Sequence, residues 1–278
     1  MGEFVPLVKL SIIILACLVV ASVYATEYFD LSYSLNNDTI FYPGQKYDFE
    51  LFKDKKGYTE SGYWYAAYSF CMAEHGGTHV DAPFHFSEKG WTLDEIPESH
   101  MIDVPATIID VQNDVFSSPT PDTFTLQVHH ILKHETQHGK IPSRSVVLVH
   151  TGWSRFWPNK QRYLGFANST NSTPTLNFPG CSIEAAKWLA NERNIVGFGI
   201  DTPSVDIGNN GGNLPVHIFL GERQIYNIEN VANLHLVIND VIKKGTVCNG
   251  VINILRLFVL PIKITGATGG PTRILAYC

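Results

Sequence analysis

The chain is poor in charged residues and cysteine and has no fixed-period repeat, and these shortages exclude several classes of protein. Charged residues make up 17% of the 278 residues and hydrophobic residues 45%, which excludes disordered, collagen-like and coiled-coil chains. Lys and Arg number 20 against 26 Asp and Glu, so we expect no nucleic-acid partner and no basic face for an anionic membrane. The length suits one large domain or two small ones.

Long hydrophobic runs are also missing, apart from one near the N-terminus. Residues 10–20 are apolar, follow Lys9 and precede small residues that end in Val-Tyr-Ala at 23–25. The run is shorter than the ~20 residues that span a bilayer. The small residues after it, with Val23 and Ala25 at positions −3 and −1, form a site that signal peptidase can cleave. We expect a signal peptide over 1–25, a mature domain over 26–278 and a secreted protein without membrane attachment after cleavage. An uncleaved membrane anchor is the alternative.

Three N-glycosylation sequons agree with secretion. They begin at Asn37, Asn168 and Asn171, and Pro174 directly after the third sequon weakens it. The segment 168–174 is polar, which predicts an exposed loop. We expect a glycoprotein.

The cysteines allow disulfides but no cysteine zinc site. After loss of Cys17 with the signal peptide, four remain: Cys71, Cys181, Cys248 and Cys278. An even number in an oxidising compartment permits two disulfides in three connectivities. Four separate buried thiols are an equal alternative, because a domain of this size has a large enough hydrophobic core to be stable without disulfides. No Cys-x-x-Cys spacing occurs.

Hydrophobic patterning of the mature chain predicts alternating strands and helices. Strands are expected at 28–35, 63–72, 106–111, 145–150, 195–200, 234–241, 251–260 and 273–277. Helices are expected at 125–134, 183–192 and 214–220, with Thr125 and Ser182 as N-caps and Pro215 in a first turn. No linker divides the chain. The sequence therefore predicts a single α/β domain with a large mixed sheet.

The residues best suited to chemistry lie in one short segment. His75, His79, Asp81 and His85 fall within eleven positions that also hold Gly76, Gly77 and Pro83. The glycines and the proline disfavour a helix and favour a strand running into a tight turn. Two imidazoles and one carboxylate can converge there on one ion and leave positions open for water. His85 lies outside that set, where it can transfer a proton.

This segment resembles the signature His-x-Gly-Thr-His-x-Asp-x-Pro-x-His of the metal-dependent cyclase family, which includes bacterial-type kynurenine formamidase and isatin hydrolase. The resemblance continues along the mature chain, through Asp-Leu-Ser at 30–32, Tyr-Pro-Gly at 42–44, Thr-Gly-Trp at 151–153, Phe-Pro-Gly at 178–180 and Gly-Ile-Asp-Thr-Pro-Ser-Val-Asp at 199–206. It implies a swivelling β/β/α domain that forms a homodimer.

The resemblance also implies roles for single residues. His75, His79 and Asp81 match metal ligands, and His85 matches the catalytic histidine. His217 and Glu229 match a pair that completes a second metal position, with Asp81 bridging. Glu222 is an acidic candidate nearer to His217, but Ile-Glu-Asn-Val at 228–231 resembles the block around the ligand glutamate. By sequence alone, His217 is typical of a hydrogen-bonded core histidine.

Several other polar residues have competing interpretations. Asp201 and Ser204 follow a predicted strand, where they either cap its end or line the rim of the site. His130, His134 and His138 are spaced for one helix face, which we predict to be solvated rather than metal-binding. Trp91 is expected to pack in the core, with substrate stacking as the alternative.

The donor set and the resemblance together predict an amide hydrolase. A divalent ion, zinc or manganese, at one or two positions would activate water for attack on an amide carbon. The first hypothesis is an arylformamidase acting on N-formylkynurenine or a similar small aromatic amide. The second is a hydrolase that opens a cyclic amide such as isatin. The third is a non-catalytic secreted binding protein on the same scaffold.

Overall fold

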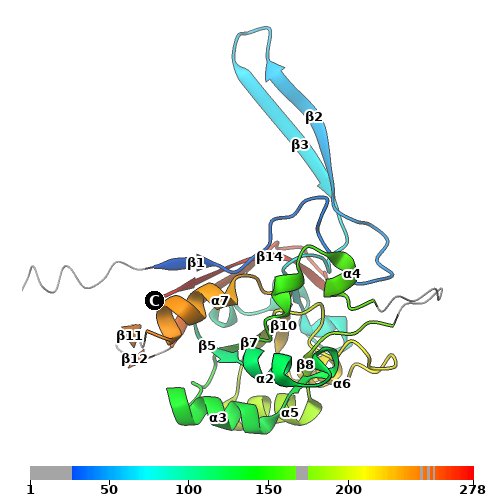
Figure 1. Ribbon diagram of the computed structural model, residues 1–278. Coiled ribbons are helices and arrows are strands. Elements are labelled where there is room, and N and C mark those ends of the chain that lie inside the picture. The colour runs from blue at the N-terminus through cyan, green and yellow to red at the C-terminus, as the bar shows by residue number, and fades with distance from the viewer. Residues whose placement is uncertain (1–26, 167–174, 245–246, 249–250, 253) are drawn as a thin grey trace, which may run out of the picture.

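The computed structural model describes residues 27–166, 175–244, 247–248, 251–252 and 254–278 (Figure 1). The expected signal peptide 1–25 and the sequons at Asn168 and Asn171 lie outside the described residues. Over the ranges just given, no helix has the length and hydrophobicity that a membrane crossing requires.

The centre of the fold is a mixed β-sheet that closes on itself. Its strands run in the order β14, β13, β5, β7, β9, β10 and β4, and β4 pairs again with β14. Strand β1 (Tyr28–Asp30) pairs antiparallel with the last residues of β14, Leu275 to Tyr277. The bounds of the ring strands are β4 His79–Asp81, β5 Val104–Asp110, β7 Val146–His150, β9 Gly197–Ile200, β10 Tyr226–Glu229, β13 Leu255–Pro261 and β14 Gly269–Tyr277.

Four neighbouring ring strands are parallel. β5, β7, β9 and β10 pair in parallel, and β7 is buried at every position. Apolar side chains on both faces explain this: Leu148 packs in one core cluster and Val147 in the other. Because the strands are parallel, their carboxyl ends meet at one edge, which carries Asp110, His150, Asp201 and Glu229.

Helices cover the outer face of the parallel strands (Figure 1). The longer ones are α2 Gln112–Ser117, α3 Val128–His138, α5 Ile183–Arg193 and α6 Pro215–Glu222. Shorter elements are α4 Lys160–Tyr163, α7 Leu234–Val237 continued by a π-helix at Ile238–Ile242, and the paired strands β6 Thr125–Leu126 with β8 Gly180–Cys181 and β11 Val247–Cys248 with β12 Val251–Ile252.

A two-stranded arm stands away from this body (Figure 1). Strands β2 (Glu50–Tyr58) and β3 (Trp64–Cys71) pair only with each other. The arm exposes large apolar side chains, including Tyr58 at 77% and Trp64 at 53% of their surface. The strand predicted at 63–72 is confirmed as β3, whereas β2 at 50–58 is not predicted from the sequence.

Most predicted elements are confirmed, and the mixed α/β architecture is as expected. The Ser182 hydroxyl accepts a hydrogen bond from the Ala185 amide at 3.1 Å, which caps α5. Pro215 begins α6.

Three predicted elements are wrong in type or bounds. Residues 234–241 are helical rather than a strand, because the buried Leu234, Val237, Ile238 and Val241 lie at positions i, i+3, i+4 and i+7 of one helix face. Thr125 belongs to β6 rather than capping a helix, and Gln127 caps the helix instead. The strand predicted at 28–35 ends at Asp30.

The histidine stripe of α3 is not a solvated face, which corrects the sequence-based interpretation. His130 and His134 are buried and line a cavity of about 310 Å³ between α3 and the π-helix. His130 Nδ1 accepts a hydrogen bond from the Gln127 amide at 2.9 Å, and its ring packs 5.2 Å from that of Phe124. The stripe is thus the packed side of the helix.

One disulfide joins the C-terminus to the body. Cys248 is bonded to Cys278, whereas Cys71 and Cys181 are free thiols. The structure thus forms one of the two disulfides that the cysteine count permits. The bond closes a loop of 30 residues.

Replacing Cys278 by serine is expected to lower the free energy of unfolding by about 2–4 kcal/mol, because an open chain regains loop entropy in the unfolded state. Urea unfolding measures the change, with Cys71→Ser as the matched control. Equal stability of the wild type and Cys278→Ser would show that the disulfide is not formed.

Candidate metal centre and active site

Strand β4 brings the candidate ligands together because it lies between two other ring strands. His79 and Asp81 are on β4, and Glu229 of β10 is the direct cross-strand partner of His79. On the other side, Gly269 of β14 is opposite Asp81. A Cβ atom at position 269 would lie 2.5 Å from Cε1 of His75, so only glycine leaves room for that ring.

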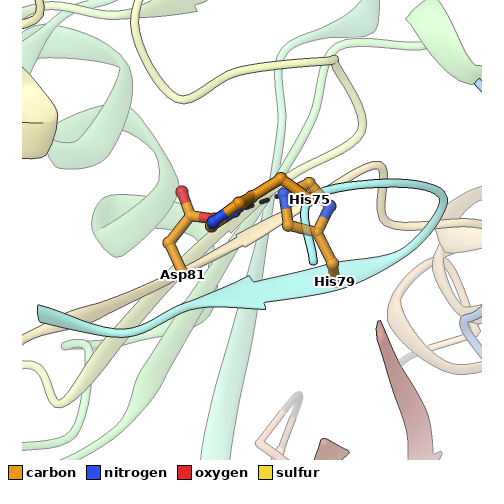
Figure 2. A group of neighbouring side chains, drawn as sticks. All are labelled: His75, His79 and Asp81. Atoms are coloured by element: carbon orange, nitrogen blue, oxygen red, sulfur yellow. Dashed lines mark hydrogen bonds and ion pairs between the residues drawn. The ribbon is translucent and has the colours of Figure 1, made fainter. Parts of the chain in front are cut away.

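The first group of candidate ligands is His75, His79 and Asp81, whose side chains converge in Figure 2. His75 Nδ1 lies 2.7 Å from Asp81 Oδ1, and His79 Nε2 lies 3.2 Å from the same oxygen. The other ring nitrogen of His75 lies 2.9 Å from the Thr268 hydroxyl. All three side chains are buried.

A second group shares Asp81 with the first and adds His217 and Glu229. His217 Nε2 lies 3.0 Å from Glu229 Oε1 and 3.3 Å from Asp81 Oδ2. His79 Nε2 lies 3.4 Å from Glu229 Oε2. Within each group the donor atoms lie within 4.8 Å of one another. The structure thus gathers all five predicted ligands, and Asp81 offers one oxygen to each group.

The orientation of the imidazoles fits a cation. His79 Nδ1 is held 2.9 Å from the Gly77 carbonyl oxygen, while its buried Nε2 points at the carboxylates without hydrogen-bond geometry to any partner. His217 Nδ1 lies 2.7 Å from Asp206 Oδ2, which leaves Nε2 facing the cluster. A histidine fixed through one ring nitrogen presents the other to a metal. Buried imidazoles and carboxylates in this number suit a divalent ion.

The cluster holds protons strongly when no ion neutralises it. Burial opposes a charge on His79, but Asp81 and Glu229 raise its pKa to about 10. Burial likewise opposes a charge on His217, whose pKa is raised by hydrogen bonds to Asp206, Asp81 and Glu229. Metal binding requires neutral imidazoles, so uptake of an ion at pH 7 is coupled to proton release.

Asp206 is a functional residue that the sequence analysis did not identify. It accepts hydrogen bonds from the backbone amides of Val216 and His217 at 3.0 and 3.1 Å, and from the His217 ring. It therefore anchors the first turn of α6 and sets the direction of His217. The sequence gives no spacing signal for it, since Asp206 appears there only as the end of the 199–206 block.

His85 lies beside the cluster. It ends the 3₁₀ turn Pro83–His85, its ring stacks 4.0 Å from that of His75, and burial lowers its pKa to about 4. Together with Tyr42, Phe86 and Leu214, it lines a cavity of about 80 Å³ that reaches Asp81, His217 and Glu229. Near neutral pH the His85 imidazole is therefore uncharged and open to the cavity.

The structure also places the other residues that the sequence offered as site candidates: one lines the metal cavity and the others do not. Ser204 lines the metal cavity. Asp201 is fully buried and accepts hydrogen bonds from Thr151, Gly152 and Ser154, so its role is structural. Glu222 is exposed at the end of α6. Trp91 packs against the core, as expected.

The ring sheet, its helices and the buried His–carboxylate cluster define a cyclase-type α/β fold. Residues 29–207 match the sequence profile of the family described as "Putative cyclase". The chain belongs to this family and is a metal-dependent hydrolase. The resemblance drawn from segment 75–85 is thereby confirmed.

Several named hydrolases are similar to the chain. It is 29% identical over 227 residues to an isatin hydrolase of Roseibium aggregatum, covering 79% of this chain and 77% of that protein. It is 27% identical over 253 residues to a kynurenine formamidase of Bacillus cereus, covering 89% and 96%. Among solved structures, isatin hydrolase A from Labrenzia aggregata, bound to benzyl benzoate, aligns with a TM-score of 0.75 and 28% identity over 96% of this chain and 98% of that one. These relatives favour the two hydrolase hypotheses over the non-catalytic one.

Replacing Glu229 by glutamine is expected to remove one of two metal positions, because Glu229 contacts the Asp81–His217 group and the other group keeps all its donors. Calorimetric titration of the metal-free protein with Zn²⁺ should give two unequal steps, since two ions that share a carboxylate repel each other. The variant should keep only the stronger step. A single step that Glu229→Gln leaves unchanged would indicate a mononuclear centre.

Proposed function

We propose that the protein hydrolyses the bond between an aryl nitrogen and a carbonyl carbon, with an N-formyl aryl amine such as N-formylkynurenine as substrate. The observation that carries this proposal is the arrangement of five buried ligand side chains around Asp81, next to a neutral histidine in one cavity. The kynurenine formamidases among its relatives support the substrate class.

The five ligand residues are His75, His79, Asp81, His217 and Glu229, which we propose hold one or two ions of zinc or manganese. Such an ion would supply Lewis acidity to the amide carbonyl and to a water molecule. Imidazole and carboxylate ligands serve both metals. Asp206 holds the imidazole of His217, and the Gly77 carbonyl holds that of His79, so both rings keep their orientation toward the ion.

His85 carries the proton in this mechanism. Its neutral imidazole accepts a proton from the attacking water and donates it to the departing nitrogen. An aryl amine leaves readily because the ring delocalises the nitrogen lone pair. Phe86 contacts both His85 and His217, with ring centroids 4.3 and 4.7 Å away, and so restricts the position of the acid–base group.

The alternative substrate is a cyclic amide such as isatin. It contains the same aryl N–C(=O) bond, and the alignment with isatin hydrolase A favours it. The two substrates are distinguished by measuring kcat/KM for N-formylkynurenine and isatin with the Zn²⁺- or Mn²⁺-loaded mature protein. We expect the formyl compound to be preferred. Preference for isatin would establish the lactam hydrolase, and hydrolysis of neither would contradict the proposal.

We also propose that the protein is secreted and glycosylated at Asn37, Asn168 or Asn171. The Cys248–Cys278 disulfide requires an oxidising compartment, and Asn37 is exposed, as a glycan acceptor must be. After expression in a eukaryotic host, the protein should be found in the culture medium. It should begin near Thr26 and lose mass on glycosidase treatment. Retention in the cell without a mass shift would contradict secretion.

We further propose that the protein is a homodimer held by the β2–β3 arm. An isolated hairpin is marginally stable in water, yet this one exposes Trp64, Tyr65 and Phe70, so packing against a second copy would bury them. Sedimentation should show a dimer for the wild type and a monomer for the double variant W64E/F70E. The control is Leu132→Glu, an exposed apolar residue on α3, which should remain dimeric.

A further inference from the structure

A second polar cavity lies at the same edge of the sheet as the metal cluster. It measures about 280 Å³ and is lined by Tyr33, Gln112, His150, Gly152, Ser154, Arg155, Asn233 and His235. His150 ends β7, and the metal cavity does not include it. In α/β folds, ligand sites commonly lie at the carboxyl ends of parallel strands, in closed barrels as well as in open sheets.

His150 presents an unpartnered nitrogen to this cavity. The side chain is buried, with 3% of its surface exposed, and Nδ1 lies 2.9 Å from Asp110 Oδ1. Its other nitrogen, Nε2, is 4.0 Å from Asp201 Oδ2, too far for a hydrogen bond. Burial opposes a charge on this ring, but the hydrogen bond to Asp110 and the charges of Asp201 and Asp110 raise its pKa. When the ring is protonated, which the raised pKa favours, its Nε2–H is a donor that faces the cavity.

Arg155 adds a second donor group. Its Nε donates to the Gly152 carbonyl oxygen at 2.9 Å, and its guanidinium lies 3.9 Å from the Phe116 ring centroid. These contacts fix the plane of the guanidinium. In the described part of the chain, no carboxylate lies within 4.0 Å of an Arg155 nitrogen, so its terminal N–H groups are available to a ligand.

The acidic groups near the cavity already accept hydrogen bonds from the protein. Both oxygens of Asp201 accept hydrogen bonds from the 151–154 segment, and Asp110 accepts from His150 and from the Gln112 amide. The Arg155 guanidinium and Nε2 of His150 therefore remain available to a ligand in the cavity. A dianion is disfavoured, because the negative charges of Asp110 and Asp201 face the same imidazole.

We propose that this cavity is a binding site for a small carboxylate, held by His150 and Arg155 and separate from the metal cluster. One carboxylate oxygen accepts from His150 Nε2–H, and the guanidinium of Arg155 binds the group through charge-assisted hydrogen bonds. A monoanion of this size fits the cavity volume and leaves the Asp110–His150 pair intact.

Equilibrium dialysis of the metal-loaded protein with radiolabelled acetate tests the proposal. The wild type should bind acetate, and Arg155→Gln should weaken binding at least about tenfold while its thermal melting and metal content stay unchanged. The matched control is Arg162→Gln, an arginine that also lies over an aromatic ring, 4.4 Å from Phe156, but does not line the cavity. A wild type that binds no acetate would overturn the proposal.

Two further arms separate the cavity from the metal. In His79→Ala, which removes a proposed metal ligand, acetate binding should persist; its loss there and its retention in Arg155→Gln would assign acetate to the metal instead. His150→Gln, checked for folding by circular dichroism, should also lose acetate. Sulfate, which is a dianion at neutral pH, should not displace acetate at equal concentration, and displacement by sulfate would contradict the assignment to a carboxylate monoanion.

Discussion

Substitution of Asp81 by asparagine is expected to empty both metal positions and to lower kcat/KM by about 10³–10⁴-fold. Asp81 alone belongs to both ligand groups, with Oδ1 facing His75 and His79 and Oδ2 facing His217. Asparagine keeps the shape of the side chain but removes its charge and replaces one ligand oxygen with an NH₂ group, which cannot bind a cation. The rate loss corresponds to the several kcal/mol of charge stabilisation that a catalytic metal supplies.

Elemental analysis and steady-state kinetics measure the two effects on the same preparation. Asp114→Asn is the matched control, because Asp114 pairs with Lys133 at 3.3 Å on the exposed side of the α2–α3 region. That variant should keep its metal and its rate. Wild-type metal content in Asp81→Asn would show that Asp81 is not the shared ligand.

The second large effect is expected for His85→Ala, which should keep its metal and lose about 10²–10⁴-fold in kcat. His85 stacks on His75 but belongs to neither ligand group. Its low pKa keeps it neutral above about pH 4, so the wild-type rate should not depend on ionisation of this residue near pH 7. Removing the imidazole takes away the neutral base that lines the cavity beside the ligands.

Metal analysis separates a proton carrier from a ligand in this variant. His129→Ala, which changes an exposed histidine on α3, is the control and should behave as the wild type. Loss of metal from His85→Ala would make His85 a ligand. Full activity of the variant on an aryl formamide would mean that another group moves the proton.

The density of ionisable side chains at 75–85 was sufficient to predict a site, because so many histidines and acids seldom gather in a turn without a ligand. His217 and Glu229 were predicted only through the family resemblance. Their approach to Asp81 depends on the register that places Glu229 opposite His79, and register between strands about 150 residues apart leaves no local mark in the sequence. Asp206 was missed although it lies only 11 residues from His217, because a lone aspartate before a helix gives no sign that it orients a ligand histidine.

Predictions of helices and strands were wrong where the local sequence pattern and the tertiary environment favour different structures. The segment 234–241 is rich in β-branched residues, but its burial follows a helical period. The row of histidines on α3 was interpreted from its polarity alone. In the structure, His130 and His134 are buried and line a cavity between α3 and the π-helix. Strand β2 is exposed at nearly every position, so it carries no hydrophobic alternation that sequence analysis could detect.

The closure of the sheet by β4 has a consequence for biosynthesis. The partners of His79–Asp81 are residues 227–229 on one side and 269–271 on the other, so the ring completes only through contacts between distant parts of the chain. Such long-range pairings form slowly and late, since a large loop must close first. Because β14 residues 269–271 pair with the strand that carries His79 and Asp81, the nascent chain lacks the complete ring around the ligands until these residues have left the ribosome. We therefore expect the protein to acquire its ions only after residues 227–229 and 269–271 have paired with β4, from the metals of the compartment in which it completes folding.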